Sequence, residues 1–273
     1  MSDNHTHPFH IVHPSPWPIC TSIALFFTTL GAALSFHGHV LGHGFCAVGF
    51  VLLIITVFSW WKDVIHEGRQ DKAHSDEVRH GLRIAMALFI ISEVAFFFVF
   101  FWSFFRAWLD PVHLLDGVWA TILSSWPPEG ITTFDAWDIP FINTLILLLS
   151  GSTVTWAHYA LDDNNQAETT QALGITVLLG ISFTCFQAFE YFHAPFKFHD
   201  GIYAANFYLA TGFHGLHVII GTIFLTVCYF RSKAGHFVEG NGHLGFEFAA
   251  WYWHFVDVVW LFLFIFVYVL SGE

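Results

Sequence analysis

The sequence has few charged residues and very few basic ones. Only 11 % of its 273 residues are charged, and nine are Lys or Arg, whereas an ordinary soluble domain carries about 25 % charged residues. A formal net charge of −12 without a basic patch argues against nucleic acid as a partner. The four cysteines form no Cys-x-x-Cys pair and mostly fall within apolar runs, so we expect buried free thiols rather than disulfides or a metal site.

What the sequence has in abundance is apolar surface. Hydrophobic residues make up 55 % of the chain and aromatic residues 19 %, with a mean hydropathy of +0.59. This composition predicts an all-α integral membrane protein. The polar, His- and Pro-rich residues 1–17 lack the basic region and short apolar region of a signal peptide. We therefore expect insertion to depend on the transmembrane segments themselves.

The apolar runs predict seven transmembrane helices. The expected spans are 18–36, 45–61, 84–108, 139–161, 173–192, 203–230 and 244–270. They divide the chain into an N-terminal polar segment (1–17), a two-helix unit (18–66), a charged internal connector (67–83) and a five-helix bundle (84–273) with a long external loop (109–138). Only Arg106 and Lys197 of the nine basic residues fall outside the N-terminal side, which predicts a cytoplasmic or matrix N-terminus and a periplasmic or intermembrane C-terminus.

Glu93 is the one ionisable residue in the third apolar run, about ten residues or 15 Å from its start. A bare carboxylate near the middle of a membrane is costly, so we expect it to be protonated, paired or turned towards other helices. Four phenylalanines share its helical face and favour the neutral acid. Two interpretations stay open, a structural acid bonded to a neighbouring helix and a proton-handling site.

Nineteen histidines invite a haem or metal interpretation, and His158, His214, His217 and His254 lie within the expected spans. No Glu-x-x-His pattern of the kind used by di-iron bundles occurs in a span. His214 and His217 share a helix with Gly212, Gly215 and Gly221. This pattern favours a close-packing surface with interhelical hydrogen bonds over metal ligation.

The last span carries a polar stripe, and another acid ends the fifth span. Glu247, Trp251 and His254 fall on one face, and Asp257 lies three residues further. The stripe is interpreted as a set of interhelical polar contacts, with a proton relay as the alternative. Glu190 lies where hydration is expected, and we expect it to have a structural role at an interface.

The inner end of the second span carries Trp60 and Trp61 beside Lys62. Tryptophans and cations at this depth are suited to an anionic phospholipid, and Arg231 at the inner end of the sixth span could join them. From the residues alone, an ordinary aromatic belt with cations extended towards the headgroups is the favoured interpretation.

Several segments closely resemble the cytochrome c oxidase subunit III family, from about Trp17 to the C-terminus. They are Phe89-Ile-Ile-Ser-Glu-Val94, Trp126-Pro-Pro-Glu-Gly-Ile131, Asn143-Thr-Leu-Ile-Leu-Leu-Leu-Ser-Gly-Ser-Thr-Val-Thr-Trp-Ala-His158, Phe186-Gln-Ala-Phe-Glu-Tyr191, Ala210-Thr-Gly-Phe-His-Gly-Leu-His-Val-Ile-Ile-Gly221 and Gly245-Phe-Glu-Phe-Ala-Ala-Trp-Tyr-Trp-His-Phe-Val-Asp-Val-Val-Trp-Leu-Phe264.

The resemblance implies a fold in which the first two helices are splayed from a five-helix bundle by a lipid-filled cleft. It implies that lipid headgroups lie near Trp60, Trp61, Glu67, His74 and Arg231, and that Glu93 is the family's buried acid. It also implies no cofactor in this chain, because the family's haem and copper sit in subunits I and II. Seven spans favour the cytochrome c branch over quinol oxidases.

The implied role is auxiliary, in a respiratory oxidase that reduces oxygen to water with electrons from cytochrome c and pumps protons. The chain would steady subunit I as its main contact, lie in a complex with subunit II, support proton uptake, bind phospholipids and line an oxygen route. The expected location is a bacterial or mitochondrial inner membrane. Two other classes are weighed: a proton-coupled transporter using Glu93 and Asp257, and a membrane haem or di-iron enzyme using the four histidines.

Overall fold

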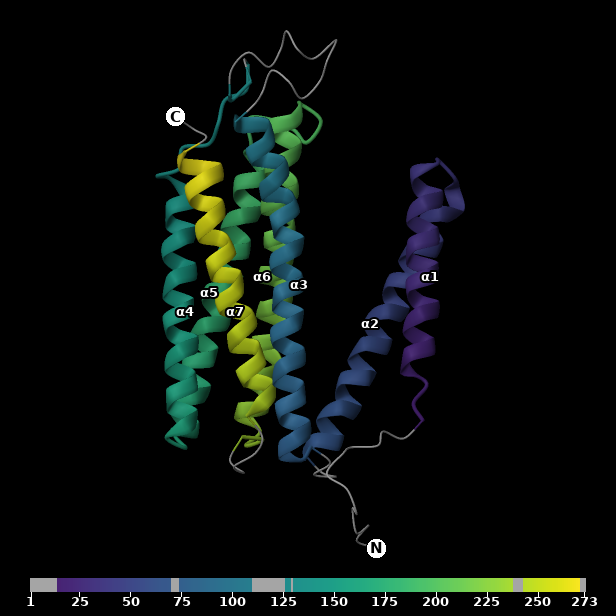
Figure 1. The fold of residues 1–273 in the computed structure, drawn as a ribbon, viewed down its shortest axis with the longest axis vertical. Coiled ribbons are helices and arrows are strands. Elements are labelled where there is room, and N and C mark those ends of the chain that lie inside the picture. The colour runs from purple at the N-terminus through teal and green to yellow at the C-terminus, as the bar shows by residue number, and fades with distance from the viewer. Residues whose placement is uncertain (1–13, 70–73, 110–125, 129, 238–242, 271–273) are drawn as a thin grey trace, which may run out of the picture. The chain divides into compact units, whose positions relative to one another are not determined.

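The chain folds into long helices (Figure 1). The computed structural model describes residues 14–69, 74–109, 126–128, 130–237 and 243–270. Within these ranges the helices are α1 (Trp17–Phe36), α2 (Val40–Arg69), α3 (Asp76–Leu109), α4 (Ile139–Asp162), α5 (Gln166–Phe192), α6 (Ile202–Lys233), α7 (Leu244–Leu263) and the π-helical η1 (Phe264–Val269). Seven segments are long and apolar enough to cross a membrane, with α7 and η1 counted together. The predicted all-helical class with seven spans is confirmed for the described residues.

Three helices run well past the spans expected from hydropathy. α2 begins at Val40 rather than 45 and continues to Arg69, and α3 begins at Asp76, so part of the connector expected at 67–83 is helical. α5 begins at Gln166 rather than 173. The Ser75 hydroxyl accepts the N–H of Val78 at 3.3 Å and caps the start of α3. The difference arises because hydropathy marks where the apolar surface ends, whereas a hydrogen-bonded helix continues until a cap or breaker.

Two of the expected non-helical segments lie largely outside the described residues. These are the N-terminal segment, of which residues 1–13 are not described, and the loop 109–138, of which residues 110–125 and 129 are not described. The described part of that loop, residues 126–128 and 130–138, is non-helical, as its content of Pro and Gly predicts.

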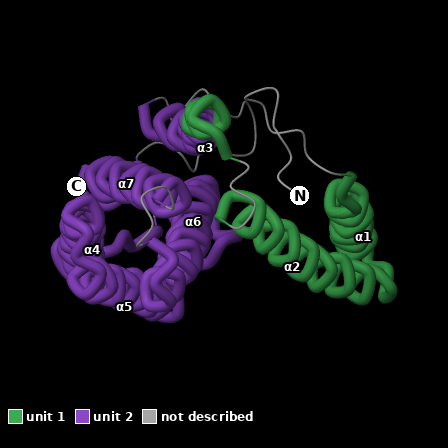
Figure 2. Tube along the Cα trace, turned by 90° about the horizontal axis from the view of Figure 1, so that it is seen from below, with its two compact units in different colours: residues 1–83 green, residues 84–273 purple. Residues whose placement is uncertain are grey.

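The chain divides into two compact units, residues 1–83 and 84–273, drawn in two colours in Figure 2. In the first unit α1 and α2 pack along a seam of small residues. A Cβ added to Gly31 would lie 2.1 Å from the backbone nitrogen of Cys46, and one added to Gly49 would lie 2.4 Å from that of Thr28. Gly42 makes the same kind of approach. Glycine therefore brings the two backbones into direct contact.

In the second unit α4, α5, α6 and α7 form a ring that closes where α7 packs on α4 (Figure 2). Residues 84–109 of α3 lie beside this ring and touch α6 and α7 through aromatic side chains. Trp253 and Trp260 of α7 are fully buried in the core. A Cβ added to Gly180 or Gly221 would lie 2.8 Å from the Trp253 indole, so these glycines make room for a ring.

The last turn of the chain widens into the π-helix η1. The N–H of Leu270 donates to the carbonyl of Ile265 at 2.9 Å, a bond that spans five residues. Such turns shift the side chains that follow them relative to an α-helix. Here Tyr268 is buried and reaches α5, where its hydroxyl meets Glu190.

Candidate functional site

Glu93 of α3 is paired with a histidine 124 residues away in the chain. The Oε2 atom of Glu93 lies 2.9 Å from Nε2 of His217 on α6. The imidazole packs edge-on against Phe97 at 4.9 Å between ring centroids and stacks on Tyr252 at 6.2 Å. This aromatic cage leaves only 21 % of the Glu93 side chain and 10 % of the His217 side chain exposed.

The hydrogen bonds of His217 fix how many protons the pair holds. Its Nδ1 lies 2.7 Å from the carbonyl oxygen of Phe213, and a carbonyl can only accept, so Nδ1 carries a hydrogen. The contact between Nε2 and Glu93 then needs exactly one more proton, either on the carboxyl group or on the ring. In both cases the pair is neutral overall, which suits a site inside a membrane.

The other histidines of the spans do not gather around a common point. His214 is buried, and its Nε2 donates to the carbonyl of Val256 at 3.2 Å. His158 lies 3.8 Å from Asp162 one turn further along α4. In the described ranges, no three His, Cys, Asp or Glu side chains form a group that could hold a metal ion.

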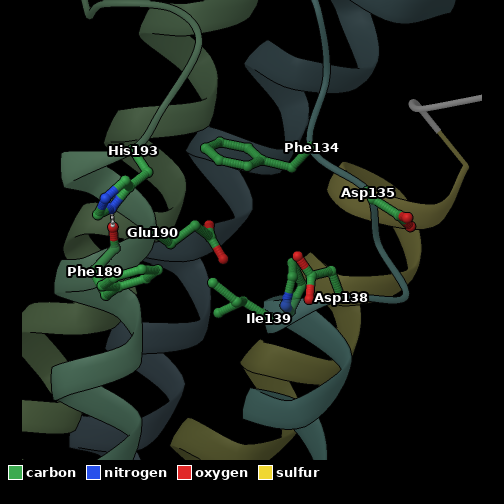
Figure 3. Close-up of a pocket in the computed structure, with 8 residues that line it drawn as sticks. Phe134, Asp135, Asp138, Ile139, Phe189, Glu190 and His193 are labelled. Carbon is green, nitrogen blue, oxygen red and sulfur yellow. Dashed lines mark hydrogen bonds between the residues drawn. The ribbon is translucent and has the colours of Figure 1, made fainter.

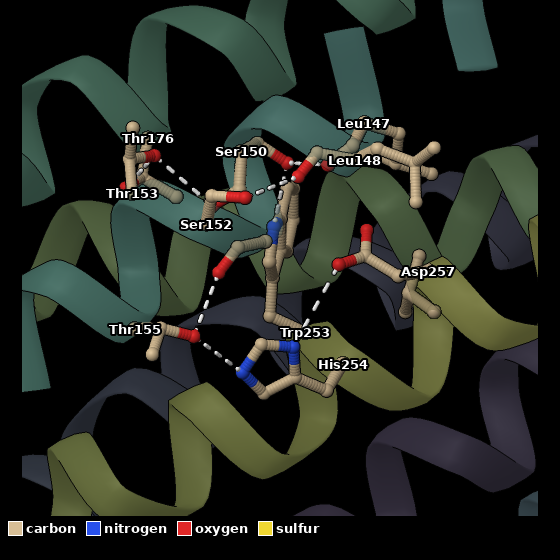
Figure 4. A network of polar contacts seen from close by, with 12 residues as sticks. Leu147, Leu148, Ser150, Ser152, Thr153, Thr155, Thr176, Trp253, His254 and Asp257 are labelled. Carbon is tan, nitrogen blue, oxygen red and sulfur yellow. Dashed lines mark hydrogen bonds and ion pairs between the residues drawn. The ribbon is translucent and has the colours of Figure 1, made fainter. Parts of the chain in front are cut away.

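A network of polar contacts joins α4 to α7, and Figure 4 shows it from close by. The Trp253 indole donates to the hydroxyl of Ser150 at 2.9 Å. Nε2 of His254 lies 3.3 Å from the Thr155 hydroxyl, and its Nδ1 lies 3.8 Å from Asp257. Trp260 makes a similar bond, 2.9 Å long, to the hydroxyl of Thr144. These bonds fix the register of α7 against α4.

Glu190, near the end of α5, is only 2 % exposed. The expectation of a hydrated side chain is therefore wrong, because Tyr268 of η1 packs against it. The Tyr268 hydroxyl donates to its Oε1 at 2.6 Å and the Gln187 amide donates to the same atom at 3.3 Å. Together with Asp138 and His193, Glu190 lines a pocket of about 250 Å³ (Figure 3).

The residues expected near lipid headgroups are distributed over both units. Trp61 is 60 % exposed near the end of α2, beside the less exposed Trp60. Glu67 is partly buried on the same helix, and the His74 ring packs over Gly68. In the second unit, the Arg231 guanidinium lies over the Phe237 ring, 5.1 Å from its centroid.

Only part of the close-packing surface predicted on α6 is used in that way. Gly221 faces Trp253, but a Cβ added to Gly215 would meet nothing within 4 Å, and one added to Gly212 would meet only Tyr191, at 3.9 Å. Gly212 and Gly215 meet no such neighbour among the described residues of this chain, because spacing along a helix does not tell which face a neighbour covers. Glu247 lies in the first turn of α7 and is partly buried.

Several residues of these sites were not expected from the sequence. Tyr268, Gln187 and Ser150 act as partners of Glu190 and Trp253, yet none carries an unusual sequence pattern. The one available signal was the spacing of Trp253 and Trp260, seven residues apart on a single helical face. Each indole N–H buried on that face needs an acceptor from a neighbouring helix.

The fold and these contacts define a class: a multi-pass membrane protein in which several of the described intramembrane polar side chains bond across helices. Residues 7–272 match the family model for cytochrome c oxidase subunit III. The chain is 61 % identical to "Probable cytochrome c oxidase subunit 3" of Rickettsia bellii and 48 % identical to "Cytochrome c oxidase subunit 3" of Arabidopsis thaliana, with 100 % of both chains covered in each case. A third relative, from Prototheca wickerhamii, is 52 % identical over 97 % of this chain and 98 % of its own. The chain belongs to the cytochrome c oxidase subunit III family.

Proposed function

We propose that this chain is an auxiliary subunit of a respiratory cytochrome c oxidase. It assembles with subunits I and II, which hold the haem and copper, and it carries no redox centre of its own. The observation that carries the proposal is that the intramembrane histidines bond to backbone carbonyls, hydroxyls or single carboxylates from separate positions. Side chains arranged in this way stabilise the packing of helices. Electron transfer would then take place at the haem and copper of the partner subunits.

The proposed work of the chain is to steady subunit I and to support proton uptake by the complex. Glu93 is the acid most suited to this role, because it holds a single proton with His217 inside an aromatic cage. Oxygen is apolar, so the exposed aromatic surface and the bound lipid of this chain would offer it an apolar approach. The N-terminus would face the cytoplasm or matrix and the C-terminus the opposite side.

Purification through a tag on this chain in mild detergent tests the auxiliary role. We expect a partner bearing haem and copper to copurify, and no haem to stay with the chain once the subunits are separated. Haem retained by the separated chain would overturn the proposal in favour of a haem enzyme. A colourless chain that purifies alone would instead favour a transporter.

We also propose that Trp60, Trp61, Glu67, His74 and Arg231 bind phospholipid headgroups. The exposed Trp61 ring and the Arg231 cation support this, since aromatic rings and cations suit an anionic headgroup. Replacing Trp61 and Arg231 together by Ala is expected to lower the anionic lipid retained by the purified complex. The matched control replaces Trp102 and Lys233, an equally exposed tryptophan and a neighbouring cation. Equal lipid content in both double variants would count against this assignment.

A further inference from the structure

The pocket beside Glu190 contains a carboxylate oxygen that lacks a donor. Both hydrogen bonds to Glu190, from Tyr268 and Gln187, go to Oε1. Oε2 is buried and has no hydrogen-bond partner among the described residues. Figure 3 shows this carboxyl group turned into the space between α4 and α5. A buried acceptor left unpaired is costly, so the pocket is built to receive a hydrogen-bond donor.

The acidic residues in the rest of the lining favour a donor that is positively charged. Asp135 and Asp138 stand at the rim, and both are exposed. Among the described lining residues there is no Lys or Arg to neutralise them. His193 is the one basic group of the lining, and its Nδ1 donates to the carbonyl of Phe189 at 2.9 Å. Two exposed acids and a buried one therefore present a negative surface to whatever enters.

The shape and chemistry of the pocket select among cations. The described side chains do not converge as metal ligands do. A volume of about 250 Å³ is far larger than a bare ion requires. A primary ammonium carries one positive charge and three N–H donors. It can donate to Glu190 and Asp138 at once, and charge-assisted bonds of this kind are the strong ones.

The location of the pocket indicates where such an ammonium comes from. The pocket lies where α4 begins at Ile139 and α5 ends at Phe192, so it sits at one boundary between apolar membrane and water. Trp137 and Phe189 are exposed beside it, as aromatic residues are at the level of lipid headgroups. We propose that this pocket binds the ammonium group of a phosphatidylethanolamine headgroup through Glu190 and Asp138.

Two other headgroup classes lack the required features. The trimethylammonium of phosphatidylcholine has no N–H and cannot satisfy the free oxygen of Glu190. Phosphatidylglycerol and cardiolipin are anionic and would be repelled by Asp135 and Asp138. The site also differs from the one proposed at Arg231, which lies at the opposite end of the second unit and favours anionic lipid. One site can therefore fail its test without affecting the other.

The test measures lipids that copurify with the oxidase complex in mild detergent, by mass spectrometry. Glu190→Gln and Asp138→Asn are each expected to retain roughly tenfold less phosphatidylethanolamine, the ratio that corresponds to about 1.4 kcal/mol. Retained phosphatidylglycerol should not change. The matched control is Glu168→Gln, an exposed acid at the other end of α5, which should retain the wild-type amount. Asp138 is exposed and makes no capping hydrogen bond, so Asp138→Asn tests the site even where Glu190→Gln prevents folding.

A second measurement separates the lipid from other cations. Wild-type complex in nanodiscs should melt at a higher temperature with phosphatidylethanolamine than with phosphatidylcholine, and Asp138→Asn should reduce that difference. Unchanged phosphatidylethanolamine in both variants would overturn the proposal. So would equal melting temperatures in the two lipids, or a stabilisation that follows sodium or potassium concentration instead. A carbodiimide cross-link from Glu190 to a lysine of another subunit would show that a protein side chain occupies the pocket.

Discussion

The two units of this chain hold their helices together in opposite ways. In the first unit, α1 and α2 approach so closely at Gly31 and Gly49 that their backbones touch, while the large side chains point outwards. In the second unit, bulky rings such as Trp253 and Phe183 fill the centre, and hydrogen bonds tie them to neighbouring helices. The first unit depends on the absence of side chains and the second on their presence.

This contrast follows from the solvent around the helices. Lipid tails are as apolar as leucine, so burying an apolar side chain between helices gains little by itself. Helices can associate by bringing backbones together, which needs glycine, or by interlocking large side chains whose polar atoms find partners. The unit that carries Glu93, Glu190 and Asp257 uses the second mode, which allows polar groups to be held inside the bundle.

Truncating a buried side chain of the second unit is expected to lower the free energy of unfolding more than any other change considered. Trp253→Ala should cost about 3–5 kcal/mol of stability, because it leaves a cavity and removes the partner of Ser150. The measurement is the unfolding free energy of the purified chain in detergent. Phe58→Ala in the first unit is the control, since Phe58 is 70 % exposed, and its change should stay within about 0.5 kcal/mol. Equal losses in both variants would remove the contrast between the units.

Adding a methyl group at the contact between α1 and α2 is expected to cause the second-largest loss of stability. Gly31→Ala places a methyl group 2.1 Å from the backbone of Cys46, and a backbone cannot turn aside as a side chain can. We expect a loss of about 1–3 kcal/mol, measured in the same way. The matched control is Gly44→Ala on α2, where the added carbon meets nothing within 4 Å. If Gly31→Ala were as stable as Gly44→Ala, direct backbone contact would not hold this pair.

Removing one hydrogen bond of the second unit should have a smaller effect. Ser150→Ala leaves the buried indole N–H of Trp253 without its acceptor. Interhelical bonds in membranes are worth about 0.6 kcal/mol on average and at most about 1.7, so the loss should lie within that range. Ser152→Ala is the control, because among the described residues its hydroxyl bonds to the carbonyl of Leu148 on its own helix and to no other helix. A larger loss for Ser152→Ala than for Ser150→Ala would contradict the assignment.

Exchanging the buried acid Glu93 for an amide should change the stability of the complex least. Glu93→Gln keeps a donor that can reach Nε2 of His217, so assembly of the complex should remain intact. Glu93→Leu removes this donor and serves as the comparison, with an expected loss of about 1 kcal/mol. Both are measured as the yield and melting temperature of the purified complex. A complex that fails to assemble with Gln would show a need for the carboxyl group itself.

The sequence predicted the spans well, because each is a long apolar run of the kind that crosses a membrane. It also marked Glu93 as a group that needs a partner. It could not identify His217 as that partner, because spacing along a helix gives the face of a residue but not its neighbour on another helix. The seam at Gly31 and Gly49 was missed for the same reason. The helix ends of α2 and α3 and the start of α5 were missed because polar turns continue beyond the apolar surface.

The single proton shared by Glu93 and His217 has a consequence for a chain in an energised membrane. A transmembrane voltage acts on net charge, with about 2.3 kcal/mol for each elementary charge moved across 100 mV. The pair carries no net charge, and the proton lies within the 2.9 Å contact between the two side chains. Rising voltage therefore does little work on it. The contact between Glu93 and His217 therefore stays in place as the voltage across the membrane rises and falls.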